Sequence, residues 1–173
     1  GAGCVVDLGV GHQWRQRGTL LKFSNTEAGI VLDGCYGFEV ADLSIQDAKV
    51  GIRLQNRNGY GSGVGRFYHV GTHHTSAGPT GIVGFQMGYV PVTGNYNASN
   101  AGDITFVRCF TKGAGYTFGG TFFQCLQDQN LNFEFIGCIA NKTDKCFDLV
   151  RGGNIYSAEF STYNCRNVLT VSS

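Results

Sequence analysis

The chain has 173 residues, of which 13 are Lys or Arg and 12 are Asp or Glu. This near balance of charge argues against a dedicated nucleic-acid binder and against a basic segment that lies on a membrane surface. No apolar run approaches the length of about 20 residues that crosses a bilayer. The composition therefore predicts no nucleic-acid partner and no membrane insertion.

The residue usage favours β-structure. Glycine is abundant and proline is rare, with 27 and 2 residues, and 13 residues are Phe. No stretch shows the spacing i, i+3, i+4, i+7 of apolar residues that a helix requires, whereas short strands separated by glycine and polar turns fit throughout. We therefore expect an all-β protein. Because Met87 is the single methionine, we also expect a processed product or a piece of a longer chain.

One pattern recurs five times along the chain: apolar, any, apolar, two residues, apolar, any, apolar. It predicts two short strands of alternating residues, joined by a bend of two residues. The copies span residues 38–45, 65–72, 104–111, 133–140 and 158–165.

A shorter apolar strand follows each copy. We expect these strands at 52–54, 82–85, 116–118, 147–149 and 169–171, with earlier strands at 20–23 and 30–32. The unit is thus three strands, and repetition of such a unit indicates a solenoid. Parallel strands normally need a helical crossover, which is missing here, but coiling around a common axis removes that need. The sequence predicts a right-handed parallel β-helix with three sheets, as a single domain over residues 1–173.

Stacking of the coils predicts two columns of inward-facing side chains. A slip of one residue would turn each column outward, so the register should be well specified. The expected columns are Phe67, Phe106, Phe135 and Phe160, and Val70, Cys109, Cys138 and Tyr163.

The chain contains seven cysteines, none in a C-x-x-C motif. They are expected to be buried, reduced thiols, with Cys109 next to Cys138, and no metal site is predicted. Such thiols suit assembly in a reducing cytoplasm.

The run from Gly18 to Ile45, which reads GTLLKFSNTEAGIVLDGCYGFEVADLSI, resembles the opening coils of pectate-lyase-like β-helices. It is most similar to those of bacteriophage tailspikes and capsule depolymerases, while the later coils match in pattern alone. The resemblance implies a homotrimer on a virion, as a piece of a longer chain, with a polysaccharide ligand and often glycan hydrolysis or elimination. No cofactor is expected.

Long connections are expected at one corner of three consecutive coils, at 55–64, 86–103 and 119–132. Loops on a rigid scaffold commonly carry function, so these three are predicted to wall a groove. Their aromatic residues suit the C–H face of a sugar, and the alternative is that the loops cover apolar sheet or contact another subunit. The aromatic residues are Tyr60, Tyr89, Tyr96, Phe122 and Phe123.

An outward column follows these loops: Glu39, Arg66, Thr105, Glu134 and Glu159. If the coils stack directly, Glu134 and Glu159 lie about 5 Å apart, which suits an acid and a nucleophile acting on a glycoside. The alternative is an exposed acidic ladder. Other predicted site residues border the same corner or could neutralise a uronic carboxylate. Asp148 and Asp103 could replace either glutamate, and the basic residues are Arg53, Arg66 and Arg108.

The expected function is therefore recognition of bacterial surface polysaccharide by a phage tail appendage. Whether the appendage also cleaves the polysaccharide stays open at this point. The catalytic candidates are Glu134, Glu159 and Asp148, and the substrate-binding candidates are Arg53, Arg66, Tyr89, Tyr96 and Asp103. A non-catalytic structural or adhesive β-helix segment is one alternative. A stand-alone polysaccharide lyase or epimerase is another. The expected location is the virion, after assembly in the host cytoplasm, or the extracellular space for a free enzyme.

Overall fold

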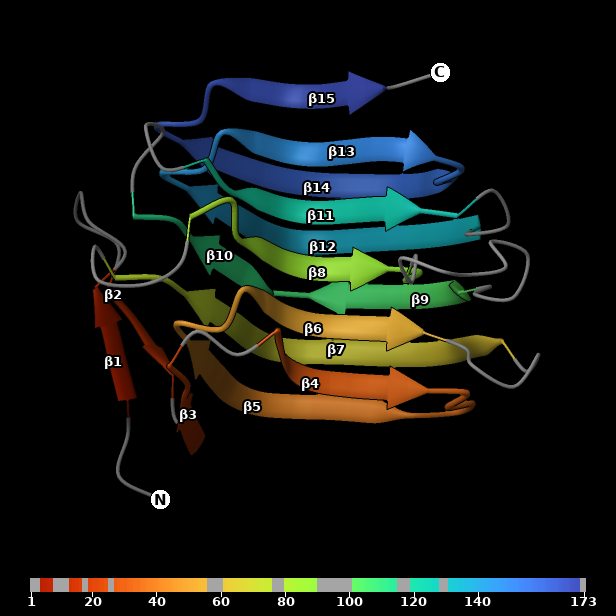
Figure 1. Ribbon diagram of the computed structural model, residues 1–173, viewed down its shortest axis with the longest axis horizontal. Helices are drawn as coiled ribbons and strands as arrows, with labels where there is room; N and C mark the ends of the chain where they lie inside the picture. The colour runs from red at the N-terminus through yellow and green to blue at the C-terminus, as the bar shows by residue number, and fades with distance from the viewer. Residues whose placement is uncertain are drawn as a thin grey trace.

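The chain forms a parallel β-solenoid in which two sheets face each other across one core (Figure 1). The computed structural model describes residues 4–7, 13–16, 19–24, 27–55, 61–75, 80–89, 101–114, 119–127 and 131–171. Every element in these residues is a strand, so the all-β expectation is confirmed. No helix among them is long and apolar enough to cross a membrane.

Each coil contributes one segment to a seven-stranded sheet and the next segment to a six-stranded sheet, and all pairings between coils are parallel. The seven-stranded sheet contains β3 (Thr19–Lys22), β5 (Glu39–Gln46), β7 (Ser62–His73), β9 (Ala101–Val107), β10 (Phe110–Lys112), β12 (Leu131–Asn141) and β14 (Ile155–Tyr163). The six-stranded sheet contains β4 (Ala28–Asp33), β6 (Val50–Gln55), β8 (Val83–Met87), β11 (Thr121–Leu126), β13 (Lys145–Arg151) and β15 (Asn167–Val171). An antiparallel hairpin of β1 (Cys4–Asp7) and β2 (Gln13–Gln16) precedes them.

The predicted three sheets are replaced by two, because the double strand of each repeat stays in one sheet. The bend lies where expected, at residues with positive φ: Asp42, His69, Arg108 and Gly137, with φ of 52°, 52°, 50° and 61°. Pairing between coils continues on both sides of the bend, as between β5 and β7. At Arg108 the strand is interrupted, which separates β9 from β10. A left-handed residue therefore turns the strand without ending the sheet.

Four of the five repeats have the expected register. Val40, Phe67, Phe106 and Phe135 are consecutive partners across β5, β7, β9 and β12, and the last three are fully buried. Cys109 and Cys138 are also fully buried and neighbouring, since Phe110 pairs with Ile139. The adjacency and burial predicted for this cysteine pair are confirmed.

The fifth repeat has a different register. Phe135 pairs with Ala158 and Cys138 pairs with Phe160, so the single residue Glu159 of β14 lies opposite the two bend residues of β12. The prediction that Phe160 continues the Phe135 column is therefore wrong. The place expected for Tyr163, beside Cys138, is taken by Phe160.

One strand of the six-stranded sheet was also misplaced. The segment 116–118 lies outside the described residues, and β11 supplies the strand of this coil at Thr121–Leu126. Phe122 and Phe123, expected in a loop, are fully buried in the core. The connection at the predicted loop corner then shortens to 127–130, and that between β6 and β7 to 56–61, so the long connection there is 88–100.

Candidate functional site

The predicted site residues divide between two opposite outer faces of the solenoid. Because side chains alternate along a strand, a residue between two core residues points away from the core. Glu134, Glu159, Arg66 and Asp103 belong to the seven-stranded sheet. The remaining described candidates are associated with the six-stranded sheet: Arg53 in β6, Tyr89 directly after β8, and Asp148 in β13. Tyr96 lies outside the described residues.

The outward column on the seven-stranded sheet exists over four coils. Glu39 pairs with Arg66, Arg66 with Thr105, and Thr105 with Glu134. Arg66 Nε lies 3.8 Å from Glu39 Oε2, and Thr105 Oγ1 donates to Glu134 Oε2 at 3.2 Å. Thr105 thereby orients the Glu134 carboxylate, while the Arg66 guanidinium packs over the Tyr68 ring at 5.1 Å.

The fifth member of the column is Ser157 in place of Glu159. Glu134 pairs with Ser157, and Glu159 follows two residues later on the same outer face. Neighbouring strands are about 4.8 Å apart and two residues advance a strand by about 6.6 Å, which places the two Cα atoms about 8 Å apart. The expected direct stacking at about 5 Å is therefore replaced by a diagonal arrangement.

A pocket of about 270 Å³ lies where the register of β12 and β14 shifts. Two residues of β12, Ile136 and Gly137, lie opposite the single residue Glu159 of β14, and Gly137 has no side chain to fill the space. The outward residues Glu159, Ser161 and Tyr163 come from β14, and Arg108 reaches in from the preceding coil. The complete lining is Arg108, Gly137, Ile139, Glu159, Phe160, Ser161 and Tyr163.

Two opposite charges share this pocket without contacting each other. Arg108 and Glu159 are both exposed, and neither forms an ion pair or a side-chain hydrogen bond within the described part of the chain. Ile139, which is 7% exposed, supplies an apolar surface between them and the core. The pocket therefore offers free donors, free acceptors and an apolar floor.

Asp103 is the third residue of β9, close to the point where the chain enters the seven-stranded sheet from the loop corner. Its carboxylate Oδ1 accepts a hydrogen bond from Asn132 Nδ2 at 2.9 Å. Asp103 and Asn132 both have positive φ, 53° and 59°, a conformation that Asp and Asn tolerate better than most residues. Asp103 borders the corner as expected, and its hydrogen bond with Asn132 connects it to the neighbouring coil.

A continuous chain of hydrogen bonds crosses the outer face of the six-stranded sheet. Arg53, Gln86, Gln124 and Asp148 are consecutive partners across β6, β8, β11 and β13. Arg53 Nε donates to Gln86 Oε1 at 2.7 Å, and Gln86 Nε2 donates to Gln124 Oε1 at 2.9 Å. Gln124 Nε2 donates to Asp148 Oδ2 at 3.0 Å. We call these four side chains the polar ladder.

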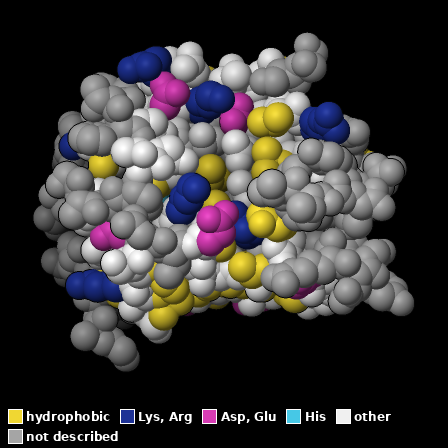
Figure 2. Space-filling view, in the orientation of Figure 1, with side chains coloured by type: hydrophobic (Ala, Val, Ile, Leu, Met, Phe, Trp, Pro, Cys, Tyr) yellow, Lys and Arg dark blue, Asp and Glu magenta, His cyan; other side chains and the backbone are white. Residues whose placement is uncertain are grey.

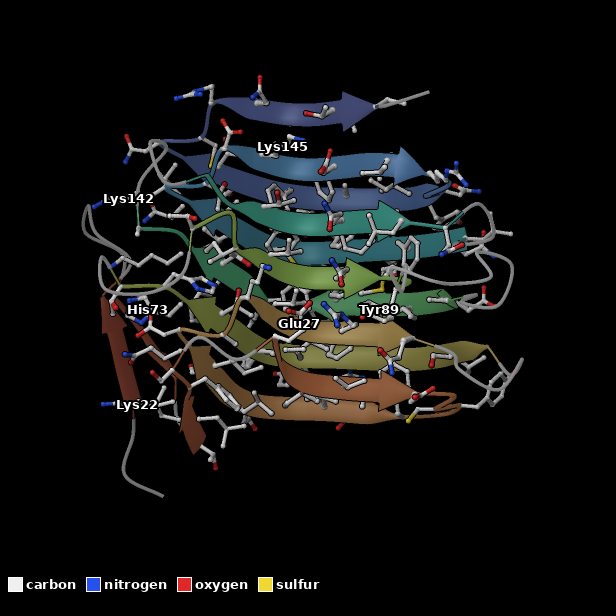
Figure 3. All side chains as sticks on the ribbon, in the orientation of Figure 1. Lys22, Glu27, His73, Tyr89, Lys142 and Lys145 are labelled. Atoms are coloured by element: carbon white, nitrogen blue, oxygen red, sulfur yellow. The ribbon has the colours of Figure 1, made fainter. Side chains whose placement is uncertain are left out.

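Charged partners close both ends of the polar ladder. Arg53 Nη2 lies 3.1 Å from Glu27 Oε1, and Lys145 Nζ lies 2.9 Å from Asp148 Oδ1. Figure 2 shows acidic and basic side chains side by side on this face, and Figure 3 places Glu27, Tyr89 and Lys145 along it. Both carboxylate oxygens of Asp148 are thus engaged, and its side chain is 5% exposed.

The polar ladder therefore changes the interpretation of three predicted site residues. Asp148 lies in the middle of β13, away from the corner that it was expected to border. Arg53 has a side chain 6% exposed and is covered by the Tyr89 ring, whose centroid is 4.3 Å from the guanidinium carbon. The expected single groove that joins Asp148 and Tyr89 to Glu134 is not formed, because the two sheets separate them.

Sequence reasoning missed Ser161 and Tyr163 as pocket residues, since Tyr163 was placed in the core. It also missed two strongly exposed tyrosines at the loop corner, Tyr36 and Tyr156, which are 76% and 80% exposed. Tyr36 lies in the short connection between β4 and β5, and Tyr156 is the second residue of β14, so neither belongs to the long connections that were expected to carry the site. Within the described ranges, no three His, Cys, Asp or Glu side chains gather closely enough to hold a metal ion.

Comparisons with protein-family models, curated proteins and solved structures gave no match for this chain.

Proposed function

We propose that the chain is part of a right-handed β-helix of a phage tail appendage that binds bacterial surface polysaccharide through the outer face of its seven-stranded sheet. The parallel coils supply a rigid, extended surface on which a long chain can lie. The resemblance of residues 18–45 to tailspike and depolymerase coils supports this class of ligand. The further elements of the proposal are a homotrimer and a position on the virion after assembly in the host cytoplasm.

The observation that carries the proposal is the pocket at the shift between β12 and β14. Sugars need an apolar surface for their C–H face and charged or amide groups for their hydroxyls. Arg108, Glu159 and Tyr163 offer these groups within one pocket, and the Arg66–Thr105–Glu134 column continues the polar surface along the solenoid axis.

Cleavage is a separate part of the proposal. With their Cα atoms about 8 Å apart, Glu134 and Glu159 can hold their carboxyl groups at the separation of about 6.5–9.5 Å that inverting glycosidases use, which leaves room for a water. The proposed form of cleavage is therefore inverting hydrolysis. In that case Glu134 and Glu159 divide the roles of general acid and general base.

Binding and cleavage are tested together on purified capsule and O-antigen polysaccharides. We expect retention of the protein on at least one immobilised polysaccharide and, for a depolymerase, a fall in its chain length measured by size-exclusion chromatography. Failure to bind any polysaccharide from a broad bacterial panel would reject the proposed function. Light scattering tests the trimer, and a stable monomer at high concentration counts against it.

A structural segment is the second candidate, and the last coil favours it. Leu169 and Val171 continue the inward columns of Phe147 and Leu149, yet they are 57% and 68% exposed. Exposed apolar side chains of this kind suit packing against another part of a structural assembly. Unchanged binding after removal of the pocket charges would favour this candidate.

A further inference from the structure

Each of the three arginines that the sequence offered as receptors for a uronic carboxylate has a glutamate beside it. Arg53 lies 3.1 Å from Glu27, and Arg66 lies 3.8 Å from Glu39. Arg108 lines the same pocket as Glu159 but forms no ion pair with it. No described arginine of this set is therefore an isolated positive charge.

We propose that the pocket between β12 and β14 binds one neutral sugar unit, with Arg108 donating to its hydroxyls and Glu159 accepting from them, and that it disfavours uronic acids. This inference rests on the proposed polysaccharide-binding function and names its ligand class. It also separates this surface from that of a lyase, whose substrates carry a carboxylate.

The polar groups of the pocket match a neutral sugar. A guanidinium has donors alone and an ionised carboxylate has acceptors alone, so the two together satisfy hydroxyls, which donate and accept. Ser161 adds a hydroxyl of its own on the same strand face. Since Arg108 and Glu159 remain unpaired with each other, both have free hydrogen-bonding capacity to offer a ligand.

The charges of the pocket oppose an acidic sugar. A ligand carboxylate that reaches Arg108 also approaches Glu159 in the same pocket. Glu134 lies on the neighbouring strand, opposite the residue two positions before Glu159. Like charges at such distances repel, which cancels much of the attraction to the guanidinium. A sugar with a free ammonium group meets the reverse conflict with Arg108.

The size of the pocket sets the length of the bound unit. Pockets for drug-sized ligands measure about 300–1,000 Å³. At about 270 Å³, this one is below that range and suits a single ring, with Ile139 and Tyr163 as apolar contacts. The rest of a polysaccharide would then extend over the open outer face of the sheet.

The test uses defined oligosaccharides of glucose, galactose, mannose and N-acetylglucosamine, each beside a partner in which C6 is oxidised to a carboxylate. Dissociation constants come from biolayer interferometry. We expect at least one neutral member to bind the unmodified protein about tenfold more tightly than its oxidised partner, because Glu159 repels the added carboxylate; tenfold corresponds to about 1.4 kcal/mol. Tighter binding of the oxidised members, or equal binding of both, would overturn the inference and leave the proposed function standing.

The variants give the sharper result. Glu159→Gln should weaken neutral binding and strengthen oxidised binding, so that the preference narrows or reverses, because the repelling charge is gone. Arg108→Gln should weaken both. Glu27→Gln makes the same chemical change on the opposite face and should alter neither. An unchanged preference in Glu159→Gln would overturn the inference, and a lack of binding to every member would reject it together with the proposed function.

Discussion

The rings of Phe106 and Phe135 stack in the core with centroids 4.8 Å apart and an angle of 17° between their planes. Both side chains are fully buried, and Phe135 also contacts the rings of Phe123 and Phe147 from the opposite sheet, at 5.0 and 5.1 Å. Truncation of Phe135 to Ala should therefore cost about 3–5 kcal/mol of the free energy of unfolding. Urea denaturation measures this loss.

Ile136 is the matched position for that measurement. It follows Phe135 in β12 but points outward and is 38% exposed. Ile136→Ala should cost well under half as much as Phe135→Ala, since an exposed side chain leaves no cavity. Equal losses for the two variants would contradict the stacked core.

The proposed inverting mechanism at Glu134 and Glu159 predicts the stereochemistry of cleavage. Glu134→Gln and Glu159→Gln keep the shape of each side chain but remove its charge and its proton transfer, so each should abolish turnover. The first product should have the anomeric configuration opposite to that of the cleaved bond, which NMR detects within the first minutes. Full activity in the double variant, or retained configuration, would show that other residues carry the reaction.

The first four repeats were predictable because a solenoid repeats its own pattern. Apolar residues inside and polar residues outside determine the register of Glu39, Arg66, Thr105 and Glu134 without knowledge of the third dimension. The fifth repeat has the same pattern of apolar residues but a different pairing register in the structure. A bend there would need a left-handed backbone at Thr162, and β-branched residues avoid that conformation. In the other repeats this position is occupied by Asp42, His69, Arg108 and Gly137. The sequence therefore indicates that the fifth repeat lacks the bend.

The strand of the six-stranded sheet that follows the third repeat was harder to predict. The apolar residues at 116–118 and the pair Phe122 and Phe123 both suit a short strand, and short apolar runs do not decide between alternatives. Burial of two consecutive phenylalanines breaks strict alternation, and only packing against Phe135 and Phe147 selects it. The pocket itself could not be predicted, because Thr162 indicates that the bend is missing but not which residues of β12 and β14 then lie opposite each other.

The polar ladder should contribute measurably to stability. Asp148→Ala leaves Gln124 without its acceptor and Lys145 without its counter-charge, so it should cost on the order of 2 kcal/mol. The double variant Lys145→Met, Asp148→Leu removes both charges and should recover part of this loss. Chemical denaturation of Lys145→Met, of Asp148→Leu and of the double variant measures the coupling between the two charges. Purely additive effects would mean that the Lys145–Asp148 pair contributes nothing.

His74 should make the fold sensitive to acid. It is 2% exposed, neither ring nitrogen has a hydrogen-bond partner among the described groups, and burial lowers its pKa from 6.5 to about 4. The unfolded chain thus takes up a proton near pH 6.5 and the folded chain only near pH 4. The contribution of neutral His74 to the free energy of unfolding is fully present above pH 6.5. It is lost as the pH falls toward 4, which lowers the free energy of unfolding by about 3 kcal/mol.

Thermal unfolding between pH 4 and 7 checks this dependence. His74→Phe should make the curve shallower, because the most deeply buried imidazole is gone, while His73, whose pKa burial also lowers, keeps part of the slope. His69→Gln is the control, since His69 lies at the surface beside Asp42, 3.4 Å away. An identical slope in His74→Phe and the unmodified protein would assign the pH dependence to other groups.

Cys165 should be the most reactive of the described thiols. The Cys146 thiol hydrogen-bonds to it and lowers the pKa of Cys165 to about 6, and Thr143 Oγ1 lies 3.1 Å from its sulfur. By contrast, burial raises the pKa of Cys109, and Cys109 and Cys138 are fully buried. Since the thiolate is the nucleophile, iodoacetamide at pH 7 should modify Cys165 well before Cys109 or Cys138, as peptide mass spectrometry would record. Cys146→Ala removes the hydrogen bond, so the pKa of Cys165 should return toward its ordinary value of 9.0. The reaction should then be about three- to sixfold slower at pH 7, because the loss of thiolate outweighs the greater nucleophilicity of a more basic thiolate. Between pH 7 and 9.5 the rate should rise steeply in the variant and stay nearly flat in the unmodified protein. The same pH profile in both proteins would show that Cys146 does not activate its neighbour.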